Sequence, residues 1–453
     1  MTAAAKHEVD LTHGSILKKL LIVAIPLVLT NILQLLFNAA DVAIVGIFVG
    51  DDAVAAVGAN TSLINLIIGL FVGLAAGVSV VLAKYVGQGD VKRSNQLVGT
   101  AILMSLIIGF VLLFVGVFGA RTFLTWMNCD PEILDGAALY LKIYCMGMPI
   151  IMLYNFAAGI LRAVGDTLRP MLFLMLGGVI NVGLNVFFVV VCDMTVDGVA
   201  IATVASQAVS AVLSMIVMFK SKGYSRFSVK HFRIYKAELV EIIRVGLPSG
   251  IQACMFNVSN VLIQSTVNSF LKVGTTANAV AHQFDAFVAM TGNGIALANM
   301  SLVSQNYGAM KIKRVKRSIW TSLIVTLIAS LSVGIIVMLL AEPLCRIMTQ
   351  DVNVIEMAKI RMNIMCCTFF IGGMMDTLTY SLRSLGKSTT AMIISIVFVC
   401  VFRVLWLNTF YLLNPTFAMI FYSYPISWAM SIIVDLMFLL PTIKKIEKAA
   451  ANA

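Results

Sequence analysis

LRAVGD, at residues 161–166, returns about 221 residues later as LRSLGK, at residues 382–387. Other residues repeat at the same spacing: Gly73 and Gly294, Gly87 and Gly308, Asp130 and Asp351, and Met171 and Met392. Pro26 matches Pro248, one residue off that spacing. A register kept over more than 200 residues is hard to obtain by chance. We therefore infer that the chain is an internal duplication.

The repeated unit is almost entirely apolar. The chain has 453 residues, of which 60% are hydrophobic and 12% charged, whereas a soluble domain carries about 25% charged residues. Apolar runs of about 20 residues, enough to cross a bilayer, recur along its length. Backbone polar groups in lipid must pair within their own segment, so these runs should be helices. Strands of a membrane barrel would alternate in character, and these runs do not.

We predict an all-α integral membrane protein with twelve transmembrane helices. The spans lie near residues 17–49, 54–84, 95–119, 133–158, 170–192, 198–219, 239–270, 275–304, 317–340, 354–380, 389–411 and 416–440. Six spans per half give both halves the same topology, related by a pseudo-two-fold axis along the membrane normal. We expect an N-terminal six-helix lobe over residues 1–220, a cytoplasmic linker over 221–238 and a C-terminal six-helix lobe over 239–453.

The net charge of +11 follows the topology and does not indicate nucleic acid. Loops on one side of the predicted bundle hold 24 of the 32 Lys and Arg residues. The positive-inside rule then predicts a multi-pass protein of the cell membrane with both termini in the cytoplasm. Residues 235–245, at the end of the linker, fit an amphipathic helix on the inner membrane surface, or a plain linker.

The sequence contains no sign of an enzyme or of nucleotide use. The glycines after the second and eighth spans are followed by Lys and Arg, but no GxxxxGK[ST] motif occurs and no strand precedes them. We therefore expect no cofactor and no ATP use. Transport, if present, must draw on an ion gradient or run downhill.

Asp41 is the clearest functional candidate, because an ionisable residue within lipid is costly. It lies about eight residues from the outer end of the first span, roughly 12 Å at helical rise. Asn181 and Asn185 share one face of the fifth span, and Thr203 and Asn155 lie on the sixth and fourth spans. One carboxylate with amide and hydroxyl oxygens could bind a proton or a hard cation such as Na⁺.

Two alternatives stay open for this group. The Asn and Thr side chains could simply hydrogen-bond helix to helix, as they often do in membranes. No basic residue at matching depth in the same half could neutralise Asp41, which favours a functional role for the acid. Burial favours the neutral form of a carboxyl group unless a cation or donor compensates, so such a group can exchange a proton for another charge.

The second half is not an electrostatic copy of the first, because position 263, opposite Asp41, is isoleucine. It carries Asp285 in the eighth span and Asp376, the repeat partner of Asn155, in the tenth. Either acid could meet a cationic substrate or relay a proton, or could belong to a local pair, for example with Arg403. His282 could titrate near neutral pH, or could simply pack.

Several segments resemble the multidrug and toxic compound extrusion (MATE) family over nearly the whole chain. They are Pro26, Gln34, Asp41 followed by Val45 and Gly46, Ala56–Gly58, Tyr85–Asp90, Gly159–Met171 and Ala279–Gln283. The resemblance implies two six-helix lobes that export organic, often cationic, compounds in exchange for inward Na⁺ or H⁺.

The resemblance also implies roles for individual residues. The family's polar cation site in the first lobe is matched by Asp41, Asn155, Asn181 and Thr203, and a nearby aromatic by Tyr140. We assign Gln34, Tyr140, Asp285, Asp376, His282 and Gln283 to the substrate pathway. Two positions depart from some relatives, which carry a second acid where this chain has Asn185 and a glutamate where it has Phe256. Asp376 matches an acid of the latter group.

We therefore expect an efflux antiporter for amphipathic organic cations, driven by H⁺ or Na⁺ through alternating access. Its partners would be small organic substrates and the lipid bilayer, with no nucleic acid, and the protein would be a monomer. An alternative is a flippase for a lipid-linked precursor, which would need a strongly basic central cavity. A channel or a receptor is a third alternative. The sequence shows neither a selectivity-filter motif nor an appended signalling domain that would support it.

Overall fold

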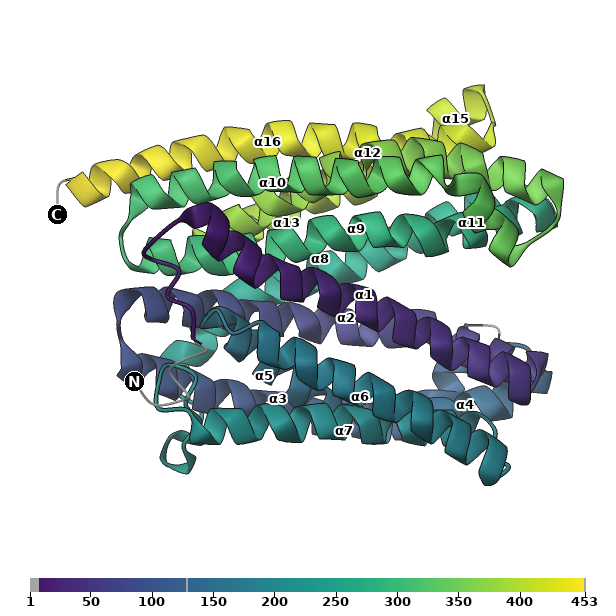
Figure 1. Cartoon of the computed structure of the whole chain (residues 1–453), viewed down its shortest axis with the longest axis horizontal. Coiled ribbons are helices and arrows are strands. Elements are labelled where there is room, and N and C mark those ends of the chain that lie inside the picture. Colours follow the sequence, from purple (N-terminus) through teal and green to yellow (C-terminus); the bar gives the residue numbers. More distant parts are fainter. Residues whose placement is uncertain (1–7, 128, 452–453) are drawn as a thin grey trace. The chain divides into compact units, whose positions relative to one another are not determined.

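The computed structural model describes residues 8–127 and 129–451, and over these residues it is a set of long helices without a strand. Figure 1 shows the helices and their order. The first half contains α1 (Ile16–Phe48), α2 (Asp51–Gln88), α3 (Val91–Trp126), α4 (Pro131–Met146), α5 (Met148–Ala163), α6 (Leu168–Val186), the π-helical turn η1 (Phe187–Val191) and α7 (Val196–Lys220). The predicted all-α fold is confirmed.

The second half follows a short 3₁₀ turn, η2 (Val229–His231). It contains α8 (Lys236–Asn268), α9 (Leu271–Gly308), α10 (Ile312–Leu339), α11 (Ala341–Met348), α12 (Val352–Ser384), α13 (Ser388–Ser395), the π-helical turn η3 (Ile396–Val401), α14 (Phe402–Asn408), α15 (Phe410–Leu413) and α16 (Phe417–Ala451). Within it, α9, α10, α12 and α16 pack side by side.

The helices account for the predicted spans. In the described part of the chain, ten helices are long and apolar enough to cross a membrane, and the bent pair α4–α5 makes an eleventh. The predicted tenth span coincides with α12, whose polar residues lower its hydropathy below the others. The twelve-helix, two-lobe layout is thus that of the prediction, although several helices extend a few residues beyond the predicted ends.

The predicted fourth span is broken by a bend of 52° between α4 and α5. Gly147 lies at the bend, where a Cβ atom would come within 2.4 Å of Val204. Pro149 follows and cannot donate a backbone hydrogen bond, so the helix cannot continue straight through this point. The sequence predicted a span here without its bend, because the tight packing of Gly147 leaves no signal in hydropathy.

Residues 236–245 are helical, which excludes the plain linker for this segment, but they are not a separate helix. They form the first turns of α8, which continues to Asn268. Glu238 is buried and accepts a hydrogen bond from Arg93 Nε at 3.2 Å, while Glu241 accepts one from Arg93 Nη2 at 3.3 Å. The charges that suggested an interfacial helix therefore tie α8 to α3.

The chain divides into two compact units. Unit 1 comprises Met1–Asp10 and Leu29–Gly250, and unit 2 comprises Leu11–Val28 and Ile251–Ala453. Two of the three boundaries fall two residues after a proline, Pro26 in α1 and Pro248 in α8. The first part of α1 therefore packs in unit 2, and the first part of α8 packs in unit 1.

Repeated glycines make this arrangement possible. A Cβ atom on Gly73 of α2 would lie 2.2 Å from the backbone nitrogen of Gly250 in α8. In unit 2, a Cβ atom on Gly294 of α9 would lie 2.8 Å from the backbone nitrogen of Val28 in α1. Both distances are too short for any side chain, so these helices approach backbone to backbone. The two glycines that repeat in the sequence therefore also make equivalent helix contacts in the two units.

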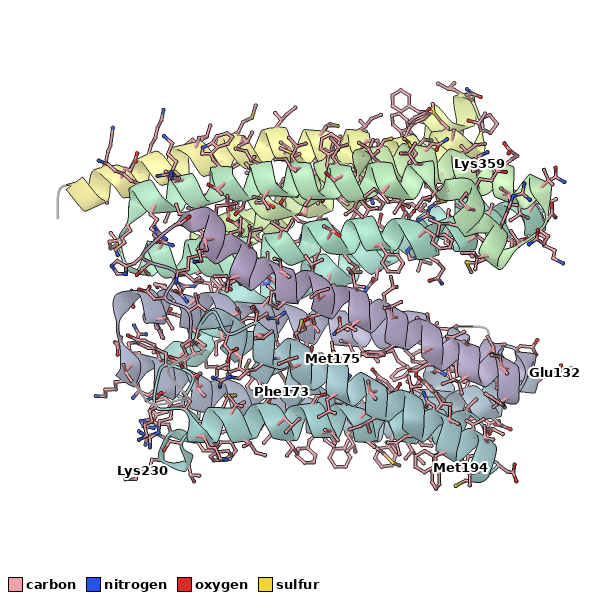
Figure 2. All side chains as sticks on the ribbon, in the orientation of Figure 1. Glu132, Phe173, Met175, Met194, Lys230 and Lys359 are labelled. Carbon is pink, nitrogen blue, oxygen red and sulfur yellow. The ribbon has the colours of Figure 1, made fainter. Side chains whose placement is uncertain are left out.

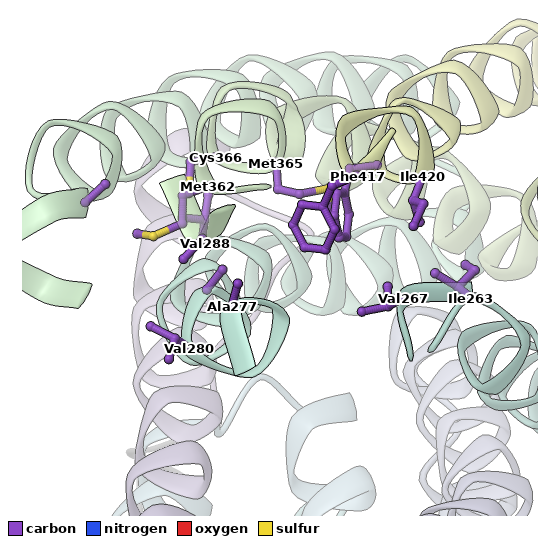
Figure 3. Packing of buried hydrophobic residues seen from close by; sticks show 14 of the residues in the cluster. Ile263, Val267, Ala277, Val280, Val288, Met362, Met365, Cys366, Phe417 and Ile420 are labelled. Carbon is purple, nitrogen blue, oxygen red and sulfur yellow. The ribbon is translucent and has the colours of Figure 1, made fainter. Parts of the chain in front are cut away.

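Each unit has its own apolar core. In unit 1 the core joins α2, α4, α5 and α7 through residues such as Ala56, Leu141, Met152 and Val199. Figure 3 shows the core of unit 2, a cluster of buried residues in which Val288 lies near Met362 and Phe417 lies near Met365. Figure 2 shows the charged side chains gathered at helix ends, with Lys230 at one end of unit 1 and Glu132 at the other.

Candidate functional site

A chain of hydrogen bonds runs through the interior of unit 1. Asn185 Nδ2 donates to Asp41 Oδ1 at 2.6 Å and lies 3.4 Å from Asn181 Oδ1. Asn181 Nδ2 in turn donates to Thr203 Oγ1 at 3.5 Å, and Thr203 donates to the carbonyl of Val199 at 2.9 Å. Helices α1, α6 and α7 each contribute to this chain. The structure thus brings four of the five residues of the predicted cation site together.

The remaining residues assigned to this region are placed differently. Asn155 donates to the carbonyl of Ile151, one turn earlier in α5, at 2.9 Å. Tyr140 of α4 is buried and stacks on Tyr144 with ring centroids 6.2 Å apart. Both phenols lie within electrostatic range of the Asp41 carboxyl group. Gln34 is exposed on α1, about two turns before Asp41.

The oxygen atoms around Asp41 are suited to a small hard cation or a proton. Asn185 is fully buried, and its Oδ1 atom has no hydrogen-bond partner. Among the described residues, Asp41 forms no ion pair with a basic side chain. No cluster of three His, Cys, Asp or Glu side chains occurs in this part of the chain. A cation bound here would therefore be held by one carboxylate with neutral amide and hydroxyl oxygens.

Asp285 of unit 2 forms a buried ion pair, in contrast to Asp41. Arg361 Nε of α12 donates to Asp285 Oδ2 at 2.8 Å, and the two side chains are 8% and 1% exposed. Arg361 Nη1 also donates to Asn278 Oδ1, and Asn278 Nδ2 donates to Gln264 Oε1 at 2.8 Å. His282 and Gln283, on the same helix as Asp285, are exposed. Of the roles considered for Asp285, the structure thus agrees with a local ion pair, and its partner is Arg361.

Arg403 pairs with neither acid, so its suggested pairing was wrong. Its Nε atom donates to Ser427 Oγ at 3.0 Å, and its guanidinium carbon lies 3.9 Å from the centre of the Tyr424 ring. Trp428 is a second aromatic neighbour. The face of an aromatic ring attracts a cation, and α16 supplies this aromatic contact because Tyr424 and Trp428 are four residues apart.

Asp376 lies on α12 and is half-buried. It accepts a hydrogen bond from Asn293 and lies within electrostatic range of Arg383. Arg383 Nη2 donates to Gln252 Oε1 at 2.9 Å, and its guanidinium carbon lies 4.8 Å from the centre of the Tyr380 ring. The structure does not join Asp376 to Asp285, although both were assigned to one substrate pathway.

Two buried charged residues were missed in the sequence. Arg361 lies near the start of α12, and Asp435 lies in α16 within Ile432–Met437, an otherwise apolar run. A charged residue inside an apolar span is a signal that the sequence alone provides. The partner of Arg361 could not be read in this way, because α9 and α12 are far apart in the sequence.

Comparison with known proteins supports the duplication and the fold. The family model described as MatE matches residues 26–187 and again residues 248–408. A probable multidrug resistance protein NorM of Thermotoga maritima is 27% identical over 389 residues, covering 84% of this chain and 82% of the relative. A probable multidrug resistance protein YoeA of Bacillus subtilis is 27% identical over 322 residues, covering 69% and 70%.

Solved structures show the same fold. One, described as the outward-facing conformation of a multidrug resistance MATE family transporter, superposes with a TM-score of 0.91 over 97% of this chain and 99% of that chain. A second, described as MATE in complex with MaL6, also gives 0.91, over 99% and 100%. The sequence identities are 22% and 21%, so these two likenesses show the fold alone.

Proposed function

This chain belongs to the MatE family, and from that premise we propose that it is a secondary active efflux transporter for amphipathic organic cations. It exchanges them for H⁺ or Na⁺ by alternating access, as a monomer with both termini in the cytoplasm. Relatives named as multidrug resistance and multidrug export proteins support this substrate class. The concentration of Lys and Arg on one set of loops supports the orientation.

The observation that carries the proposal is the electrostatic state of Asp41. Its carboxyl group has an amide donor but no basic partner among the described residues, whereas the equally membrane-embedded Asp285 is neutralised by Arg361. An ionised carboxylate in an apolar interior needs a compensating cation. Asp41 therefore has to take up a proton or a metal ion, and Asn185, Asn181 and Thr203 supply the neutral oxygens around it.

Binding at this site can be coupled to cargo if the two ligands favour different conformations. A ligand shifts a conformational equilibrium only by the difference in its affinity for the two states. A monovalent cation entering the cytoplasm releases about 2.3 kcal/mol for each 100 mV of membrane potential. Ion binding at Asp41 would favour the state that releases cargo outward, and its release inward would reset the transporter.

The test is transport of a fluorescent organic cation by the purified protein in liposomes. Export should follow an imposed pH gradient or an imposed Na⁺ gradient, and the effective gradient identifies the coupling ion. Asp41→Asn should abolish gradient-driven export while leaving expression and folding intact. Asp135→Asn is the matched control, because it removes one negative charge from an exposed carboxyl group in the first turns of α4. Unchanged export by the Asp41→Asn variant would remove this residue from the mechanism.

A further inference from the structure

Asp435 is a fully buried acid that the site around Asp41 does not use. It lies in α16 of unit 2 and has 0% exposure. Thr379 Oγ1 of α12 donates to Asp435 Oδ2 at 3.1 Å, and the other carboxyl oxygen, Oδ1, has no hydrogen-bond partner. Over the described residues it forms no ion pair. One neutral donor is poor compensation for a buried negative charge.

A second acid, Asp376, interacts electrostatically with Asp435. Asp376 lies one turn before Thr379 on the same face of α12, within electrostatic range of Asp435. The two acids differ in their surroundings, because Asp376 is half-buried, accepts a hydrogen bond from Asn293 and feels the charge of Arg383. Negative charge is therefore better supported on Asp376 than on Asp435.

The other charged groups on elements packed against α16 do not change this preference for negative charge on Asp376. Arg403 contacts α16 at Tyr424 and Ser427, and Ser427 is two turns before Asp435, roughly 12 Å along the helix. The basic residues of α10 lie in its first two turns, over residues 312–317, where Arg314 donates to the carbonyl of Leu11. Lys387, which precedes α13, is exposed. Among the residues that the structure describes, Arg383 is the basic group that acts on the acid pair, through Asp376.

We propose that Asp376 and Asp435 form a proton-binding site in unit 2, in which Asp435 holds the proton and Asp376 carries the negative charge. Two carboxyl groups close together in an apolar interior cannot both ionise. A cation that arrives beside Asp376 removes the repulsion between them. The O–H bond of Asp435 then breaks, its proton leaves to solvent, and the cation replaces that positive charge, so the net charge of the site is unchanged.

This exchange rests on the proposed transport function, but the protonation of Asp435 does not. The repeat shows that the site is particular to unit 2. At the spacing of about 221 residues, the partners of Asp376, Thr379 and Asp435 are Asn155, Ala158 and Ser214. Ser214 is buried like Asp435 and donates to the carbonyl of Ser210. Unit 1 thus fills the same places without an acid pair, and the acid of its candidate site is Asp41 on another helix.

Infrared spectroscopy can detect the proton directly. The full-length protein in lipid nanodiscs should show the carbonyl stretch of a neutral carboxylic acid, with a shift in heavy water, over a titration from about pH 5 to about pH 9. Asp435→Asn should remove this band. Asp435→Ser should do the same and introduces the residue that unit 1 accommodates at the matching position. Thr379→Val keeps the acid but removes its donor, so the band should move in frequency. In Asp376→Asn the band should disappear at lower pH.

Cation-driven proton release tests the second step. In the Asp41→Asn background, adding tetraphenylphosphonium to weakly buffered protein should release protons stoichiometrically, and adding Asp376→Asn should abolish the release. A spectrum identical in the original protein and in both Asp435 variants, or release that survives Asp376→Asn, would overturn the proposal. The two ideas fail separately, because an Asp41→Asn variant should lose export yet keep the Asp435 band.

Discussion

The buried ion pair between Asp285 and Arg361 offers a quantitative test of the structure. The atoms are 2.8 Å apart, both side chains are almost fully buried, and Arg361 keeps a second contact with Asn278. Replacing Asp285 by leucine leaves the guanidinium without its counter-charge. Removing one partner of such a pair costs about 3–5 kcal/mol of the free energy of unfolding, whereas replacing both by apolar residues of similar volume is often neutral.

The measurement is a double-mutant cycle with Asp285→Leu, Arg361→Met and the double variant. Each single variant should lose about 3–5 kcal/mol and the double variant little, so equilibrium unfolding in mixed micelles should give a coupling energy of up to about 6–10 kcal/mol. The same cycle on Arg121 and Asp135, which lie 2.9 Å apart but are 66% and 80% exposed, should give no measurable coupling. Export by the double variant should resemble that of the original protein.

Additive losses, with a coupling below about 0.5 kcal/mol, would refute the reasoning about burial. A double variant that is stable but unable to transport would refute the assignment of Asp285 to a local pair. It would return this acid to the substrate pathway. The two outcomes are separable because stability and export are measured on the same three variants.

Three further results are expected. Gly73→Ala places a Cβ atom 2.2 Å from backbone in α8 and should cost about 1–3 kcal/mol or more in unfolding experiments, whereas Gly58→Ala, with nothing within 4 Å, should be neutral. Arg403→Met removes a buried guanidinium that lacks an acidic partner, so thermal stability should be kept or raised. Asn185→Asp places a second carboxyl group 2.6 Å from Asp41, and the pair must share a proton. Liposome export should then depend more steeply on pH; an unchanged profile would contradict the position of Asn185.

Much of the fold could be predicted because the bilayer limits the choices. The matching of LRAVGD with LRSLGK and the length of the apolar runs were enough to predict two sets of six helices. The bend at Gly147 was not predicted, because Pro149 is visible in the sequence but the close contact of Gly147 with Val204 in another helix is not. The extension of α8 back to Lys236 was missed because Glu238 and Glu241 resemble a surface pattern until Arg93 is seen beside them.

The candidate site also has a part that the sequence could predict and a part that it could not. Depth along a helix was sufficient to group Asp41 with Asn181, Asn185 and Thr203, because all four lie at comparable distances from the outer helix ends. Depth says nothing of rotation about the helix axis, and Asn155 donates to its own helix. Charge partners were hardest to predict, since Asp285 meets Arg361 across 76 residues of sequence.

The first part of α1 packs in unit 2 and the first part of α8 packs in unit 1. This arrangement determines when each unit can fold during translation. Residues 11–28 leave the ribosome long before residues 251–453, with which they pack in unit 2. At about 5–20 residues per second, this segment waits tens of seconds in the bilayer before α9 offers Gly294 as its partner. Unit 1 in turn cannot close until residues 236–250 have been translated. Neither half of the chain is therefore a self-sufficient folding unit, because each takes the first part of a long helix from the other half.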